Sequence, residues 1–210
     1  MSTPDEEPWW LPMGRELRAM AQIGLTFSKD PFDRQRFERL REVAASLVAR
    51  GAGADDSVLL DLFLKEAGYA TPKVDVRGAA FRDGRILMVR EITDGRWTLP
   101  GGWADVNQTA AECVVREIAE ESGFEARAVK LAAVHDYRKR HPPRHIDSIY
   151  KMFFLCELTG GSPRPSNETS EVEFFARDAL PELSQGRTTA AQVELMYRHL
   201  HEPELATDFD

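Results

Sequence analysis

The spacing of apolar residues along the chain changes near residue 72. Before that point, apolar positions recur every three to four residues, which predicts helices. Three helices are expected, over about residues 9–25, 31–49 and 56–67. Beyond residue 72, apolar and polar residues alternate, as they do in half-buried strands. We therefore expect a helical domain over residues 1–71 and a second domain over residues 72–210.

The second domain is predicted to mix strands with two helices. Strands are expected over about residues 74–80, 85–91, 97–99, 126–137, 149–158 and 171–176. Asp83-Gly84 lies between the first two strands and fits a hairpin turn, because both residues tolerate positive φ angles. Helices are expected over about residues 109–122 and 188–200. This order predicts an α/β or α+β sandwich, in which helices cover a sheet.

Residues 99–124, LPGGWADVNQTAAECVVREIAEESGF, contain the clearest candidate for chemistry. Thr109 and Glu112 have the spacing of a capping box, and Gly123 suits the end of a helix. Three glutamates share the helix face opposite the apolar side: Glu117, Glu120 and Glu121. Like charges this close are unfavourable unless a cation lies among them, so this face is a candidate divalent-metal site.

Composition narrows the possible function classes. The formal net charge of -8 over 210 residues argues against a broad surface for nucleic acid or an anionic membrane. No apolar run reaches the roughly 18 residues of a membrane span, and the acidic start MSTPDEEPWW does not resemble a signal peptide. The two cysteines, Cys113 and Cys156, are typical of reduced thiols in a cytoplasmic protein.

Residues 102–124 resemble the Nudix box, G-x5-E-x7-R-E-U-x-E-E-x-G-U, where U is apolar. Eight of the nine positions match, namely Gly102, Arg116, Glu117, Ile118, Glu120, Glu121, Gly123 and Phe124. Gln108 stands where the pattern has its first glutamate. The resemblance extends over about residues 72–204. Residues 9–45, WWLPMGRELRAMAQIGLTFSKDPFDRQRFERLREVAA, resemble the Nudix subgroup with an N-terminal helical extension. Members of that subgroup are assigned to CDP-choline and ADP-ribose type pyrophosphatases.

The resemblance implies a Nudix α/β/α sandwich with a mixed sheet, preceded by a small all-helical extension. It implies a hydrolase that splits the pyrophosphate bond of a nucleoside diphosphate linked to a group X. The products would be a nucleoside monophosphate and X-phosphate. Mg²⁺ or Mn²⁺ is the expected cofactor, since divalent cations neutralise phosphate charge and orient water. CDP-choline and ADP-ribose lead the candidate substrates, and the sequence does not identify the nucleoside or X.

The resemblance also assigns roles within the box. Glu117 and Glu121 would be the principal metal ligands, with Glu120 sharing the site and the Gly101 carbonyl as a further ligand. Glu117 is also the candidate for orienting or deprotonating water. Arg116 would orient Glu117 through a charge-assisted hydrogen bond. The alternative is an ordinary solvated helix face with an Arg116–Glu120 ion pair, which the Gly-Gly turn and the full spacing disfavour.

Further candidates lie outside the box. A basic loop is a candidate for holding substrate phosphates, through Arg138, Arg140, Arg144 and His145. Glu168 or Glu171 could supply a late acid, as in some relatives. Trp103 follows the Gly-Gly turn and either flanks the ligand or covers the sheet. The alternatives are a solvated hairpin tip for the loop and a surface strand for the acids.

Other functions stay open at this point. A nucleoside triphosphate or RNA 5′-end pyrophosphohydrolase is the alternative within the same chemistry, although the acidic net charge disfavours long RNA. A nucleotide-sensing module without catalysis is the alternative from another class, although the box keeps its last three glutamates. The aromatic residues of the helical domain predict a partner surface, which is either a homodimer interface or the second domain. They are Trp9, Trp10, Phe27 and Phe32.

Overall fold

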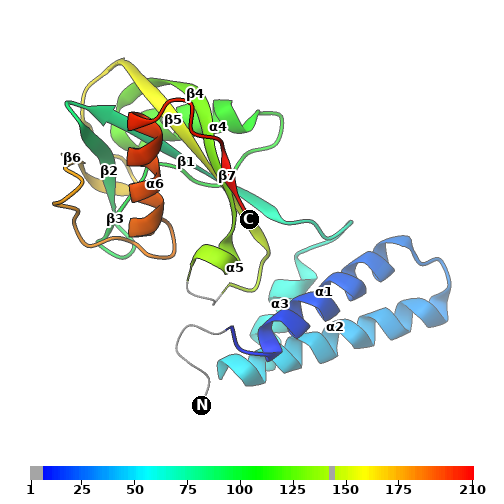
Figure 1. Cartoon of the computed structure of the whole chain (residues 1–210). Coiled ribbons are helices and arrows are strands. Elements are labelled where there is room, and N and C mark those ends of the chain that lie inside the picture. The colour runs from blue at the N-terminus through cyan, green and yellow to red at the C-terminus, as the bar shows by residue number, and fades with distance from the viewer. Residues whose placement is uncertain (1–6, 142–144) are drawn as a thin grey trace. The chain divides into compact units, whose positions relative to one another are not determined.

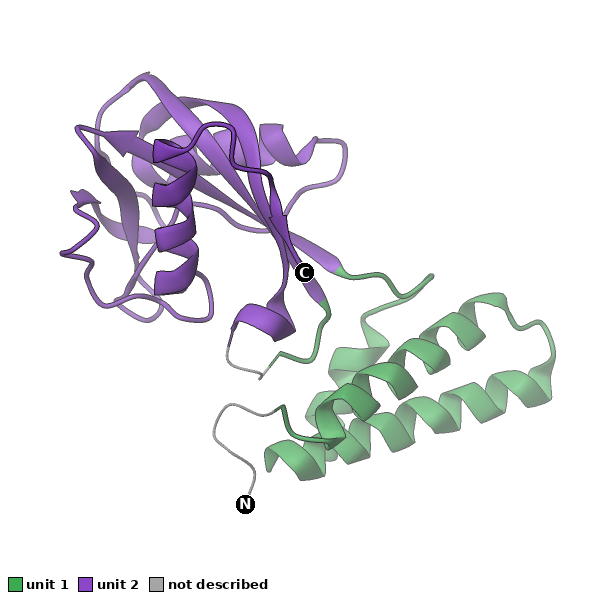
Figure 2. Cartoon of the chain, viewed as in Figure 1, with its two compact units in different colours: residues 1–72, 142–148 green, residues 73–141, 149–210 purple. Residues whose placement is uncertain are grey.

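The computed structural model describes residues 7–141 and 145–210, and it divides the chain into two compact units (Figure 2). We call residues 1–72 with 142–148 the helical unit. Residues 73–141 with 149–210 form the sheet unit. The expected boundary between residues 71 and 72 lies next to the structural one. Residues 142–148 are also grouped with the helical unit, which the sequence pattern did not predict.

The helical unit contains the three predicted helices (Figure 1). They are α1 (Trp10–Phe27), α2 (Pro31–Ala52) and α3 (Asp56–Leu64). Asp30 caps α2 as its side chain accepts from two backbone N–H groups, and Gly53 ends α2 in the left-handed conformation. A small core joins the helices, made by Ala44, Ala45, Val48 and Phe63. Trp10 is partly buried against this core, whereas Trp9, Phe27 and Phe32 are exposed.

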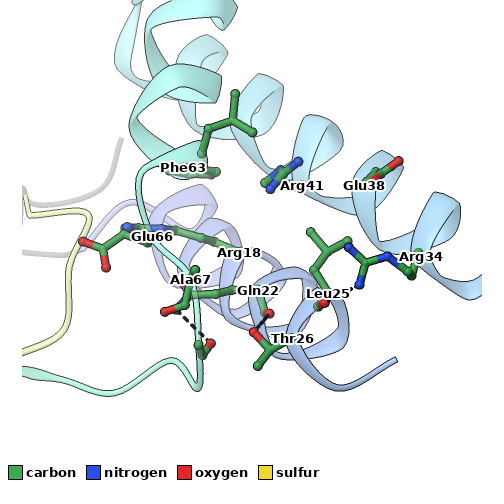
Figure 3. Close-up of a pocket in the computed structure, with 12 residues that line it drawn as sticks. Arg18, Gln22, Leu25, Thr26, Arg34, Glu38, Arg41, Phe63, Glu66 and Ala67 are labelled. Carbon is green, nitrogen blue, oxygen red and sulfur yellow. Dashed lines mark hydrogen bonds between the residues drawn. The ribbon is translucent and has the colours of Figure 1, made fainter. Parts of the chain in front are cut away.

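A cavity of about 390 Å³ lies within the helical unit, between α1, α2, the end of α3 and the segment that follows it (Figure 3). Its wall contains Arg18, whose guanidinium carbon lies 4.8 Å from the centroid of the Phe63 ring. The same guanidinium donates to Asp147 at 2.8 Å, so part of the returning segment is fixed to α1. No helix in residues 7–141 or 145–210 is long and apolar enough to cross a membrane.

The sheet unit contains a seven-stranded sheet in the order β3-β2-β1-β5-β4-β7, with β6 paired to β2. Its strands are β1 (Lys73–Arg82), β2 (Arg85–Glu91), β3 (Trp97–Thr98), β4 (Phe124–Asp136), β5 (Ile149–Gly161), β6 (Thr169–Phe175) and β7 (Asp208–Phe209). Its helices are α4 (Ala110–Ser122), α5 (Tyr137–Arg140) and α6 (Ala190–His201). The β1–β5 and β4–β7 pairs are parallel and the others are antiparallel, so the predicted mixed sheet is confirmed.

Helices α4 and α6 cover opposite faces of this sheet (Figure 1). On β1, Val76 packs in the core that contains α4, and Ala79 packs in the core that contains α6. Gly78 faces α4, where an added Cβ would lie 2.6 Å from the Ile118 side chain. The missing side chain therefore lets α4 lie close to the strand, and the predicted α/β/α sandwich is confirmed.

Two short elements were not expected from the sequence. The first part of the predicted basic loop forms helix α5 instead. The Asp136 side chain caps the start of this helix. Near the end of the chain, Asp208 and Phe209 pair with β4 and extend the sheet. Both elements are too short for an apolar period to indicate them.

The two long helices of the sheet unit begin with matched capping boxes, which allows a paired stability test. Thr109 and Thr189 each accept a backbone N–H at the third helical position, and that residue's side chain accepts in return. We predict that Thr109→Ala and Thr189→Ala each lower the free energy of unfolding by about 1 kcal/mol. Urea denaturation measures both. An unchanged midpoint for Thr109→Ala would show that the cap does not stabilise α4.

Candidate active site

The Pro-Gly-Gly turn lies along the edge of β1. Three backbone hydrogen bonds fix it there, from Gly78 N–H to the Pro100 carbonyl (2.8 Å), from Val76 N–H to the Gly102 carbonyl (2.8 Å) and from Ala104 N–H to the Val74 carbonyl (2.9 Å). The turn therefore continues the sheet beside the first half of β1. It reaches α4 through the loop that follows it.

The two glycines of the turn have different surroundings. Gly101 has a φ of 146°, and an added Cβ would lie 2.0 Å from the Val76 carbonyl oxygen. Gly102 faces the helix instead, where an added Cβ would lie 3.3 Å from the Glu117 carboxylate. The turn is thus held between the backbone of β1 and a carboxylate of α4.

Glu121 connects α4 to this turn. Its side chain is 5% exposed, and one carboxylate oxygen accepts a hydrogen bond from the Gly101 N–H at 2.8 Å. Burial raises the pKa of Glu121 to about 8, although the nearby charge of Arg77 and the Gly101 hydrogen bond lower it. The carboxyl therefore lies where a further positive charge would favour its ionised form.

Arg116 forms ion pairs with the other two glutamates of the box helix, Glu117 and Glu120. Its guanidinium lies 3.0 Å from Glu117 and donates to Glu120 at 2.6 Å and to Asp105 at 2.8 Å. Burial raises the pKa of Glu117, and Arg116 opposes this shift. Glu120 and Asp105 are largely exposed, so their pairs with Arg116 are surface contacts. The sequence pattern did not indicate Asp105.

Two further acids lie near this cluster. Glu91, at the end of β2, is 6% exposed and pairs with Arg187 at 2.9 Å. Burial raises its pKa, and the charge of Glu168 raises the pKa of both Glu91 and Glu117. The backbone carbonyl of Glu168 accepts a hydrogen bond from the N–H of Ile92, the residue after Glu91, at 3.0 Å. Glu171 instead pairs with Arg90 at 2.6 Å.

The sequence pattern did not reveal Glu91. Its pairing with β6 shifts register between Arg90 and Glu91, and such bulges redirect side chains. The only available signal was a glutamate at the end of a strand with four consecutive apolar residues.

The described residues that were predicted to hold phosphates have partners within the protein. Arg138 pairs with Asp136, and Arg140 pairs with Asp208 (3.1 Å) and Asp210 (2.9 Å). His145 belongs to the helical unit, where its backbone carbonyl accepts from Arg15. Arg144 lies outside the described residues. Trp103 is 47% exposed and directly follows the turn.

The donor set at the box suits a hard divalent cation. Glu117, Glu121 and the Gly101 carbonyl offer only oxygen atoms, and Mg²⁺ prefers a few such ligands together with water. Within the described part of the chain, no three His, Cys, Asp or Glu side chains are grouped as a metal site. The carboxylates contact Gly101 N–H and Arg116 instead. The residues therefore fit a cation chemically.

Comparison with known proteins decides the family. Residues 8–63 match the profile described as a UDP-X-like, N-terminal oligomerisation domain, and residues 71–196 match the NUDIX domain. The chain belongs to the Nudix hydrolase family. The helical unit and the sheet unit thus correspond to the two parts of a known domain combination, and the proposed resemblance is confirmed.

Several Nudix relatives match most of the chain. A putative ADP-ribose pyrophosphatase, YjhB of Bacillus subtilis, is 44% identical over 96% of this chain and 97% of its own length. The crystal structure of a UDP-X diphosphatase is 32% identical, with a TM-score of 0.63 over 96% of this chain and 98% of that one. An ADP-ribose pyrophosphatase structure from Streptococcus suis is 41% identical, with a TM-score of 0.62 over 67% of this chain and 100% of that one.

Gln108 is the one departure from the Nudix box, and the structure shows its contacts. Its amide oxygen accepts from Arg116 Nε at 3.2 Å and from the Cys113 thiol at 3.4 Å. The glutamine thus braces Arg116, which in turn pairs with Glu117. A carboxylate oxygen could accept the same hydrogen bonds.

We predict that Gln108→Glu changes the hydrolysis rate by less than about tenfold, because the acceptor for Arg116 is kept. Gln108→Ala should lower the rate by about tenfold, because Arg116 loses that acceptor. Steady-state kinetics at fixed Mg²⁺ measures both. The control is Gln35→Glu, the same chemical change at an exposed position of α2. A rise in turnover of about 100-fold in Gln108→Glu would contradict the bracing role.

Proposed function

We propose that this Nudix hydrolase cleaves the pyrophosphate bond of a nucleoside diphosphate joined to a group X, with Mg²⁺ or Mn²⁺ as cofactor. The products are a nucleoside monophosphate and X-phosphate. The observation that carries the proposal is the Pro-Gly-Gly turn held against the carboxylates of α4, which places the Gly101 backbone beside Glu121 and Gly102 beside Glu117.

In this proposal, Glu117, Glu121 and the Gly101 carbonyl hold the cation, and Glu120 shares the site. The bound cation neutralises charge that develops on the phosphates. Glu117 orients the attacking water and accepts its proton, and Arg116 fixes the Glu117 carboxylate.

A late acid completes the proposed set of catalytic groups. Glu168 is the better candidate because its charge acts on Glu117, whereas Glu171 is paired with Arg90. Trp103 stays a candidate for contact with the substrate, since it is half exposed beside the turn. Arg138 and Arg140 are weaker candidates for binding phosphate, because aspartates already balance their charge.

ADP-ribose is the leading substrate. The Bacillus relative and the Streptococcus protein are both named as ADP-ribose pyrophosphatases. A UDP-linked compound is the second candidate, because the UDP-X diphosphatase matches nearly the whole chain. CDP-choline remains a candidate through the resemblance of the N-terminal extension.

We also propose a cytoplasmic homodimer. The name of the matching N-terminal profile supports an oligomer, and the helical unit exposes large apolar side chains that a second copy could cover. They include Trp9, Phe27, Phe32 and Val58. Both cysteines are free and buried, in accord with a reducing compartment.

The proposed activity is tested with Mg²⁺ and a panel of ADP-ribose, UDP-glucose, CDP-choline and deoxynucleoside triphosphates, with products separated by chromatography. We expect AMP and ribose 5-phosphate from ADP-ribose. Glu117→Gln and Glu121→Gln should each lower kcat on the order of 100-fold or more, because each removes a carboxylate charge and keeps the side-chain shape. Glu125→Gln, at an exposed position of β4, is the matched control.

Undiminished turnover in Glu117→Gln would rule out the assigned mechanism. Binding of a nucleotide without turnover of any compound would favour the sensing module. Release of pyrophosphate from triphosphates alone would favour the triphosphatase.

A further inference from the structure

Three charged side chains are buried together in the sheet, away from the box helix in sequence. Asp75 and Arg77 come from β1 and Lys151 from β5, and they are 6%, 4% and 2% exposed. Asp75 and Lys151 are direct partners in the parallel β1–β5 register. Buried ion pairs are often no more stable than apolar residues of the same volume, so their presence calls for a role beyond stability.

The three side chains hold the Arg77 guanidinium in one orientation. It binds Asp75 through two hydrogen bonds, from Nε to Oδ1 at 3.0 Å and from Nη2 to Oδ2 at 2.8 Å. Lys151 Nζ lies 2.9 Å from the same Oδ1. The remaining guanidinium nitrogen, Nη1, donates to the Leu99 carbonyl at 3.2 Å. Leu99 is the residue directly before the Pro-Gly-Gly turn.

Arg77 thus adds a side-chain bond to the backbone bonds that hold the turn on β1. Gly78 N–H, from the next residue of the strand, donates to Pro100. The two bonds fix consecutive carbonyls just before Gly101, whose N–H donates to Glu121.

We propose that Arg77 is a positioning residue for the metal site. Anchored by Asp75 and Lys151, it fixes the turn at Leu99 and thereby the place where Gly101 meets Glu121. This inference rests on the proposed function, since it assigns the turn and Glu121 to a divalent cation. The planar guanidinium of arginine is required, because the single ammonium group of a lysine cannot donate to Asp75 and to the Leu99 carbonyl in the same fixed geometry.

A purely structural role predicts a different result. If the three side chains only fill the interior, their replacement lowers the unfolding temperature and leaves cation affinity unchanged in the folded protein. If Arg77 positions the turn, cation affinity falls even well below the unfolding temperature. The affinity for Mn²⁺ alone therefore separates the two roles without reference to any substrate.

The experiment is a Mn²⁺ titration of the full chain, in which the free Mn²⁺ signal is followed by electron paramagnetic resonance. Arg77→Lys keeps the charge and should weaken Mn²⁺ binding by about tenfold. Asp75→Asn keeps the side-chain shape and should weaken it in the same direction, and this variant carries the test if Arg77→Lys does not fold. Arg82→Lys is the matched control, because Arg82 is an exposed arginine of β1 that stacks on Phe124 and Phe174.

A kinetic readout accompanies the titration. In Arg77→Lys, the Mg²⁺ concentration needed for half-maximal rate should rise about tenfold, while KM for ADP-ribose at saturating Mg²⁺ changes less than about twofold. A change confined to KM would overturn the positioning role, since it would indicate contact with substrate.

The outcomes separate this inference from the proposed function. If the unaltered protein binds Mn²⁺ and Arg77→Lys and Asp75→Asn bind it equally well, the positioning role is wrong and the proposed function stands. Equal weakening in Arg82→Lys would also overturn the positioning role, because any change to β1 would then suffice. If the unaltered protein binds no Mn²⁺, the proposed metal site fails and the role of Arg77 fails with it.

Discussion

The contact between the Gly101 N–H and the Glu121 carboxylate is the point on which the rest of the site depends. It joins a turn that is hydrogen-bonded to β1 with a helix that packs on the same sheet. Neither partner could be moved alone, because Gly101 lies against the backbone of Val76 and α4 lies against Gly78. The sheet therefore acts as a common base that sets the distance between a backbone carbonyl and a row of glutamates.

Charge balance is the second constraint. The sheet unit buries carboxylates at Asp75, Glu91 and Glu121, and a buried charge is unfavourable without a partner. The nearby positive charges are those of Arg77, Lys151 and Arg187. The balance is incomplete at the box helix, where burial still raises the pKa of Glu117 and of Glu121. In the proposed function, a divalent cation bound there would supply the missing positive charge. The same carboxylates would then change from mutually repelling groups to ligands.

The sequence predicted the local features of the site well. Capping residues and the spacing of apolar positions determine a helix and its faces within a few turns. Helix α4, its N-cap Thr109 and its acidic face could therefore be predicted from the sequence. Contacts between distant strands left no such pattern. Arg77 looks like any polar position of an alternating strand, and only the fold brings it to Leu99. For the same reason, the basic segment looked free to bind phosphate, although Arg140 is paired with aspartates from the end of the chain.

The central claim is that the turn and α4 together form a divalent-cation site. It is tested most directly by anomalous diffraction from a crystal of this protein grown with Mn²⁺. We expect an anomalous peak about 2.1 Å from oxygen atoms of Glu121 and of the Gly101 carbonyl, with Glu117 also at the ion. A structure with Mn²⁺ bound only elsewhere, and with Glu121 still bonded to the Gly101 N–H, would contradict the claim.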